Sequence, residues 1–234
     1  MTKRAAIKTF RSALFYAGAV GLCVPPLFVF AWMIMTGLKT GVQNIAYPPE
    51  FLFTPTLENF QAVFQQHHFF RYLMNSLIIA TLATGLSLVL GLPAAYSIAK
   101  YRQGRIGMII LLARMTPFVS YLLPWYIIFR YLKLIDTYTA LTLTHLIITL
   151  PMVAWLMVAF FESVPAELED AAMIDGCSRL KSFLIIVLPL VRNGIATSAI
   201  MAFIFSWNQF LFSLILSGPQ TKTVPVAVYN FRGT

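Results

Sequence analysis

Long apolar runs separated by short polar segments dominate the chain. A helix that crosses a bilayer needs about 20 mostly apolar residues. Five runs reach that length, and they cover residues 13–38, 72–99, 106–129, 137–161 and 193–221. The third contains the one charge found within a run, Arg114. The pattern predicts an all-α integral membrane protein with five spans. The first run is too long for the core of a cleavable signal peptide, so it is interpreted as a retained anchor.

The polar segments between the runs predict the orientation in the membrane. With the N-terminus in the cytoplasm, the inside segments are 1–12, 100–105 and 162–192, and they hold ten Lys and Arg. The outside segments 39–71, 130–136 and 222–234 hold six. Cytoplasmic loops carry the excess of Lys and Arg in membrane proteins. We therefore expect a cytoplasmic N-terminal tail and a multi-pass protein of a prokaryotic inner membrane.

Composition agrees with these spans. Hydrophobic residues make up 59% of the chain, charged residues 11%, and the mean hydropathy is +0.78. Soluble domains are nearer half apolar and a quarter charged. The formal net charge of +9 comes mainly from the ends of apolar runs, which does not indicate a nucleic-acid partner.

Two outside segments have features of their own. Residues 39–71 contain a short amphipathic pattern, TLENFQAVFQ, with Thr56 as candidate N-cap and Phe60, Val63 and Phe64 on one face. Residues 222–234 are interpreted as a polar extracytoplasmic loop that ends before a sixth span.

Five of the eight acidic residues fall in one inside segment, between Glu162 and Asp175. Ser163 is the candidate cap of a helix there, and Gly176 is placed where a helix can end in a left-handed turn. A second helix is expected over 178–188 until Pro189 breaks it. The segment predicts two helices joined by a glycine elbow on the cytoplasmic face.

Three interpretations of this acidic segment compete. A catalytic or metal site would need partner residues such as histidines, but His67, His68 and His145 lie in other segments. An inert solvated loop does not account for the Ala171–Ala172 pair or for the position of Gly176. Docking of a short helix into the groove of a cytoplasmic partner accounts for both, and we favour it. No catalytic residue and no metal site is expected.

The segment DAAMIDGCSRLKSFLIIVLP resembles the EAA loop of ABC-importer permeases. That pattern is Glu-Ala-Ala, three residues, Gly, nine residues, Ile, one residue and Leu-Pro, and every spacing holds from Asp170 to Pro189. Asp170 stands where the family has Glu, and Asn193 lies close to where many relatives have proline. The segments TPTLENF, RMTPFVSYLLPWYIIFRYLKLIDTY and FSWNQFLFSLIL are similar to the carbohydrate-uptake branch, in its maltose-permease-G-like subunits, in which Glu often replaces Gln209.

The resemblance implies a type I ABC-importer permease bundle, normally of six spans, that carries a sugar, oligosaccharide or polyol. It also implies partners: a cytoplasmic ATPase dimer that holds ATP and Mg²⁺, a second homologous permease subunit, and an extracytoplasmic solute-binding protein. The chain has no phosphate-binding Gly-x-x-x-x-Gly-Lys-Ser/Thr motif. The resemblance places ATPase coupling in the loop 162–189, at Glu167, Glu169, Asp170, Ala171, Ala172, Asp175, Gly176, Ile186, Leu188 and Pro189.

Candidates for the substrate pathway are the polar groups inside the runs. Asn208 and Gln209, beside Trp207, could bond sugar hydroxyls or neighbouring helices. Arg114 could be functional, or could snorkel or pair structurally. Asn75, Ser76 and His145 are interpreted as helix-packing groups. The alternatives are a permease for a non-sugar solute such as glycerol phosphate, and a secondary transporter. The latter lacks the intramembrane carboxylates that its coupling usually needs.

Overall fold

The protein is described by a computed structural model that covers residues 3–66 and 69–231. The chain divides into two compact units, 1–68 and 69–234. Within the described ranges every regular element is helical, which agrees with the predicted all-α class.

The first unit consists of one long helix and a folded segment after it. Helix α1 (Lys3–Leu38) includes most of the predicted tail, and α2 (Gly41–Asn44), α3 (Glu58–Gln61) and the π-helix η1 (Ala62–Gln66) follow. The Asn59 amide donates to the carbonyls of Gly37 and Lys39, at 3.0 and 2.7 Å, and so ties α3 to the end of α1. Thr56 Oγ1 accepts the Glu58 N–H at 3.2 Å, although the cap position is Leu57. His67 and His68 lie outside the described residues.

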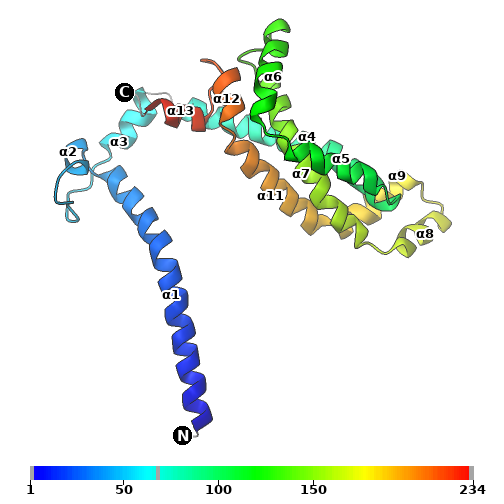
Figure 1. Ribbon diagram of the computed structural model, residues 1–234, viewed down its shortest axis with the longest axis horizontal. Coiled ribbons are helices and arrows are strands. Elements are labelled where there is room, and N and C mark those ends of the chain that lie inside the picture. The colour runs from blue at the N-terminus through cyan, green and yellow to red at the C-terminus, as the bar shows by residue number, and fades with distance from the viewer. Residues whose placement is uncertain (1–2, 67–68, 232–234) are drawn as a thin grey trace. The chain divides into compact units, whose positions relative to one another are not determined.

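Three helices form the core of the second unit. Helices α4 (Phe69–Lys100) and α7 (Tyr138–Glu162) pack along one another, and α11 (Arg192–Trp207) packs against both (Figure 1). Small and hydroxyl residues let α4 and α7 approach. Ser87 and Thr149 share a hydrogen bond of 2.6 Å, and a Cβ at Gly91 would lie 2.9 Å from Val153. This is the small-residue packing expected where lipid gives helices no hydrophobic reason to associate.

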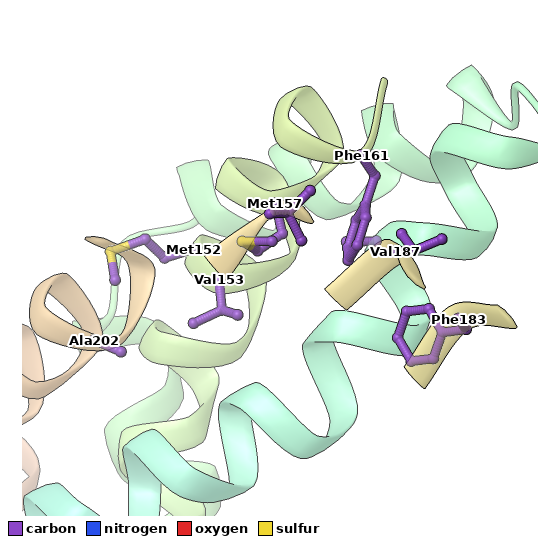
Figure 2. Packing of buried hydrophobic residues seen from close by; sticks show 9 residues of the cluster. Met152, Val153, Met157, Phe161, Phe183, Val187 and Ala202 are labelled. Atoms are coloured by element: carbon purple, nitrogen blue, oxygen red, sulfur yellow. The ribbon is translucent and has the colours of Figure 1, made fainter. Parts of the chain in front are cut away.

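A buried apolar cluster joins this core to the acidic segment. Figure 2 shows Met157 and Phe161 from α7 beside Phe183 and Val187, which follow the predicted elbow in sequence. Met152, Val153 and Ala202 continue the cluster toward α11. The elbow therefore rests on the same packed core as the membrane helices.

Two of the five predicted spans are not continuous helices. The third run forms α5 (Gly104–Met115) and α6 (Val119–Tyr131), and the break contains Pro117, which has no N–H to donate. The fifth run forms α11 and α12 (Leu211–Leu216), separated by residues 208–210. Within the described part of the chain, three helices are long and apolar enough to span a membrane: residues 11–38, α4 and α7. A bent pair, 179–190 with 192–207 at 79°, makes up to four.

The predicted polar loop at the C-terminal end is also a helix over most of its length. Helix α13 (Val224–Phe231) begins where the Val224 N–H donates to Ser76 Oγ of α4 at 2.9 Å. Val226 and Ala227 are buried. Pro225 fits the first turn, where its missing N–H costs nothing.

Asp136 fastens the loop between α6 and α7 to the loop between α12 and α13. Its carboxylate accepts the backbone N–H groups of Gly218, Gln220 and Thr221 and the Thr221 hydroxyl, at 2.7–3.1 Å. Burial raises the pKa of Asp136, but these hydrogen bonds outweigh it, and the pKa lies below the ordinary value of 3.8. We call this set of contacts the Asp136 clasp.

Candidate functional site

The acidic segment folds as the predicted elbow. Helix α8 (Ala166–Ile174) ends at Gly176, whose φ of +83° is the left-handed conformation that glycine adopts without penalty. Helix α9 (Arg179–Ser182) then starts with the Ser178 hydroxyl accepting the Lys181 N–H. It continues through the π-helix η2 (Phe183–Val187) and α10 (Leu188–Leu190). Helices α8 and α9 lie at one end of the second unit, and α12 and α13 at the other (Figure 1).

The predicted cap at Ser163 is wrong. Its hydroxyl donates to the Phe160 carbonyl at 2.7 Å and so closes the end of α7, while Pro165 takes the N-cap position of α8. The reason is that Ser163 follows α7 directly and remains within reach of its unpaired carbonyls.

The inner face of α8 is held to α4 by charge. Glu169 is buried, forms an ion pair with Lys100 and accepts a 2.5 Å hydrogen bond from the Tyr96 hydroxyl. Ala172, on the same face, is 5% exposed. A carboxylate removed from water in this way needs a cation and a hydrogen-bond donor, and the last turns of α4 supply both.

Aromatic packing supports the same junction. The Tyr96 ring lies 4.7 Å from the ring of Phe183 in η2 and 5.7 Å from that of Phe161 in α7. Arg179 donates to the Tyr101 hydroxyl at 2.6 Å, between α9 and the residue that follows α4. We call the set of Tyr96, Lys100, Glu169 and Phe183 the elbow strut. Both arms of the elbow thus contact the end of one membrane helix.

The outer face of α8 carries no such contacts. Glu167, Asp170, Ala171 and Ile174 follow the i, i+3, i+4, i+7 spacing of one helix face, and all four are exposed. Ile174 is 87% exposed. A short helix that presents acidic and apolar groups together suits a groove in a protein partner.

The structure divides the remaining sequence-predicted coupling residues between surface and interior. Asp175 and Gly176 are exposed at the turn, and Pro189 is exposed before the bend into α11. Ile186 and Leu188 are half-buried in η2 and α10, beside the cluster that contains Val187. Their coupling role remains a prediction.

Three of the four predicted pathway residues lie where α11 ends. Trp207 ends α11 and stacks on Phe203 at 5.7 Å, while the Asn208 amide donates to the Ile204 carbonyl of its own helix at 2.8 Å. Gln209 is half-buried. Arg114 lies in α5, and its side chain is outside what the structure describes. Contact of these residues with substrate stays a prediction.

The packing roles predicted for three polar residues are confirmed. The Asn75 amide donates to the carbonyls of Gln220 and Lys222 and accepts from the Tyr138 hydroxyl. His145 is buried and hydrogen-bonds Ser206 at 2.7 Å. Among the described residues no three His, Cys, Asp or Glu side chains gather in a group that could hold a metal.

Sequence reasoning missed Tyr96, Lys100 and Ile174. Lys100 was counted only as a loop charge that sets orientation. The helical spacing that places Glu167, Asp170, Ala171 and Ile174 on one face would have identified Ile174. No sequence signal pairs Lys100 with Glu169, because 69 residues separate them.

Known proteins are similar to this chain in sequence. The family described as "Binding-protein-dependent transport system inner membrane component" matches residues 87–231. The chain is 37% identical over 218 residues to the sulfoquinovosyl glycerol transport system permease protein SmoH of Agrobacterium fabrum, covering 91% of this chain and 76% of that protein. It is 33% identical over 239 residues to the trehalose/maltose transport system permease protein MalG of Thermococcus litoralis, covering 97% and 83%.

A solved structure has the same fold. The match has a TM-score of 0.77 and 21% identity, and covers 99% of this chain and 81% of the other. That structure is the crystal structure of a bacterial ABC transporter involved in the import of the acidic polysaccharide alginate. A family of this kind works with an ATPase and a solute-binding protein, and ATP hydrolysis belongs to the partner. The chain belongs to the inner membrane components of binding-protein-dependent transport systems, as the permease subunit of an ABC transporter.

Proposed function

We propose that this permease imports a carbohydrate and that α8 is its docking helix for the ATPase. The observation that carries the proposal is the division of α8 into an exposed outer face and an inner face bound to α4. The outer face holds Glu167, Asp170, Ala171 and Ile174, and the inner face holds Glu169 and Ala172. A helix built this way receives a partner on one side and transmits its movement on the other.

Docking rests on complementary shape and charge. Ile174 inserts into an apolar depression of the ATPase, and Glu167 and Asp170 face cationic groups at its rim. Asp170 is one methylene shorter than the glutamate typical of the family, so its partner must approach closer to the helix backbone. ATP and Mg²⁺ are bound in the ATPase dimer.

Transmission uses the elbow strut. When the ATPases close, α8 moves as a rigid body, and the contacts of Glu169 with Lys100 and Tyr96 move the end of α4 with it. The Phe183 ring, packed on Tyr96, transmits the same displacement from the second arm. Coupling between two distant sites needs rigid elements with two alternative arrangements, and α4 is such an element.

The remaining parts of the proposal concern partners and substrate. A second homologous permease subunit completes the pore, and the N-terminus and elbow face the cytoplasm. Gln209 and Trp207, at the break between α11 and α12, contact substrate in the pathway. Two relatives are named for the transport of sulfoquinovosyl glycerol and of trehalose/maltose, which supports a carbohydrate.

Docking is tested with Ile174→Glu and a matched control, Ile45→Glu. The two isoleucines are 87% and 84% exposed, but Ile45 lies in the segment predicted to be extracytoplasmic. We expect Ile174→Glu to reduce the ATPase that co-purifies with the permease at least about tenfold, because a charge replaces the apolar anchor that docking would bury. Equal ATPase recovery with both variants, at equal permease yield, would overturn the docking proposal.

The substrate class is tested on the binding protein encoded with this permease. Its melting temperature is measured with a panel of monosaccharides, disaccharides, polyols and glycerol phosphate. A ligand that binds only the folded protein raises that temperature, by an amount that grows with the ligand concentration relative to its Kd. A shift with a sugar or polyol supports the proposal, and a shift with glycerol phosphate alone contradicts it.

A further inference from the structure

A cavity of about 420 Å³ opens between α4, α5 and α7, close to the elbow end of the second unit. This volume falls in the range of ligand pockets. Its walls are mainly apolar. The residues that line it are Ile98, Arg102, Gly104, Gly107, Met108, Trp155, Val158, Ala159 and Glu162.

Two opposite charges stand at the rim of this cavity. Arg102 lies in the turn between α4 and α5, with φ of +50°, and Glu162 is the last residue of α7. Both side chains are exposed. In the described part of the chain the one salt bridge joins Lys100 to Glu169, so it leaves Arg102 and Glu162 available to a ligand. Arg102 and Glu162 also line an adjoining cavity of about 520 Å³, together with Lys100, Glu169 and Asp170.

The cavity deepens from the helix ends into the membrane. Trp155 precedes Glu162 by seven residues, which corresponds to about 10 Å along a helix. Val158 lies between these levels on α7, and Ile98 lies two residues before the end of α4. The charged rim therefore stands at the depth of lipid headgroups, and the apolar walls stand at the depth of the acyl chains.

Glycines keep one wall open. Gly104 has no atom within 4 Å of the position a Cβ would take, and at Gly107 that Cβ would meet Ile98 at an ordinary 3.7 Å. A larger side chain at Gly107 would thus enter the cavity without a clash at its first atom. This property makes the cavity testable by filling it.

We propose that this cavity binds one phosphatidylethanolamine molecule of the surrounding membrane. Its phosphate accepts hydrogen bonds from Arg102, its ammonium donates to Glu162, and one acyl chain lies against Ile98, Met108, Trp155 and Val158. Charge selects this headgroup. Phosphatidylglycerol has no cation for Glu162, and the trimethylammonium of phosphatidylcholine has no N–H to donate.

The test uses the assembled transporter, purified with its partner subunits from nanodiscs of phosphatidylethanolamine, phosphatidylglycerol and phosphatidylcholine in equal parts. Lipid retained after detergent washing is identified and counted by native mass spectrometry. We expect phosphatidylethanolamine to be enriched over its bulk share. Arg102→Gln should lower its retention at least about tenfold, since a charge-assisted hydrogen bond is lost. Arg105→Gln, at a neighbouring exposed arginine outside the cavity, should not.

Two further variants test the binding of the acyl chain and the recognition of the headgroup separately. Gly107→Leu should abolish retention of all three lipids, whereas Gly85→Leu, at an exposed glycine of α4 with open space around it, should retain phosphatidylethanolamine. Glu162→Gln should remove the preference for phosphatidylethanolamine over phosphatidylglycerol. Retained lipid at bulk proportions, or retention in Arg102→Gln and Gly107→Leu that equals that of the parent protein, would overturn the site. Lipid retention is independent of the transported solute, so its failure would leave the proposed function standing.

Discussion

Two carboxylates, at opposite ends of the second unit, secure loops in different ways. Asp136 accepts three backbone N–H groups and one hydroxyl from residues 218–221. Glu169 is held instead by two side chains of a separate helix, Lys100 and Tyr96. The first is a fixed set of backbone donors and the second an ion pair between movable elements.

This difference separates a static junction from a transmitting one. The backbone donors come from one short loop, and a Cβ at Gly218 would lie only 2.5 Å from the Asp136 carboxylate, so glycine is needed for this close approach. An ion pair between α8 and α4 can tilt while both helices remain rigid. We therefore expect the Asp136 clasp to serve stability, and the proposed function assigns transmission of movement to the elbow strut.

The largest expected effect on stability comes from Asp136→Ala. The substitution leaves four donors without an acceptor, and hydrogen bonds to charged groups contribute about 1.5–3 kcal/mol each, with incomplete additivity. We expect a loss of about 3 kcal/mol, measured as a lower unfolding temperature of the solubilised transporter. Asp136→Asn, which keeps one acceptor oxygen, should lose less. If both variants melt like the parent protein, the clasp does not secure these loops.

A smaller effect concerns pH. Because the pKa of Asp136 is lowered on folding, its stabilisation is complete above the unfolded value and is lost as pH falls through the folded value. The stability difference between the parent and Asp136→Asn should therefore shrink between pH 5 and about pH 2. Thermal melts of both proteins across this range measure it. A difference that stays constant would contradict the lowered pKa.

The smallest effect belongs to the exposed contact between Arg179 and Tyr101. Tyr101→Phe removes one hydrogen bond of 2.6 Å at an exposed site. Such contacts contribute about 0.5–1 kcal/mol or less. We expect import and ATP hydrolysis to change less than about twofold. If Tyr101→Phe lost as much import as a Lys100 variant, the contact that transmits movement would be that of Arg179 in the second arm of the elbow and not that of Glu169 in the first.

The elbow was predictable because its signals are local. The acidic residues, the Ala-Ala pair and Gly176 lie within fifteen residues of one another, and the glycine turn follows from backbone geometry alone. The helices α4 and α7 were predictable from the length of their apolar runs. The prediction that Ser163 caps α8 was wrong because a serine between two helices can hydrogen-bond either the start of the second helix or the end of the first.

Other features depend on contacts distant in sequence. Apolar composition cannot reveal that the third and fifth runs break, since the residues around Pro117 and Asn208 are as compatible with a kink as with a break. The pairing of Lys100 with Glu169 and of Asp136 with residues 218–221 exists only once the helices are packed. The two faces of α8 could be listed from helical spacing, but which face turned inward required the position of α4.

The most direct test of transmission through the elbow strut measures solute import and ATP hydrolysis in the same proteoliposomes. The variants are Lys100→Glu, Glu169→Lys and the double exchange, which restores opposite charges. We predict that each single variant retains ATP hydrolysis but imports at least about tenfold less solute per ATP, and that the double exchange recovers much of the loss. An unchanged ratio of import to hydrolysis in both single variants, in correctly assembled transporter, would contradict transmission through this contact.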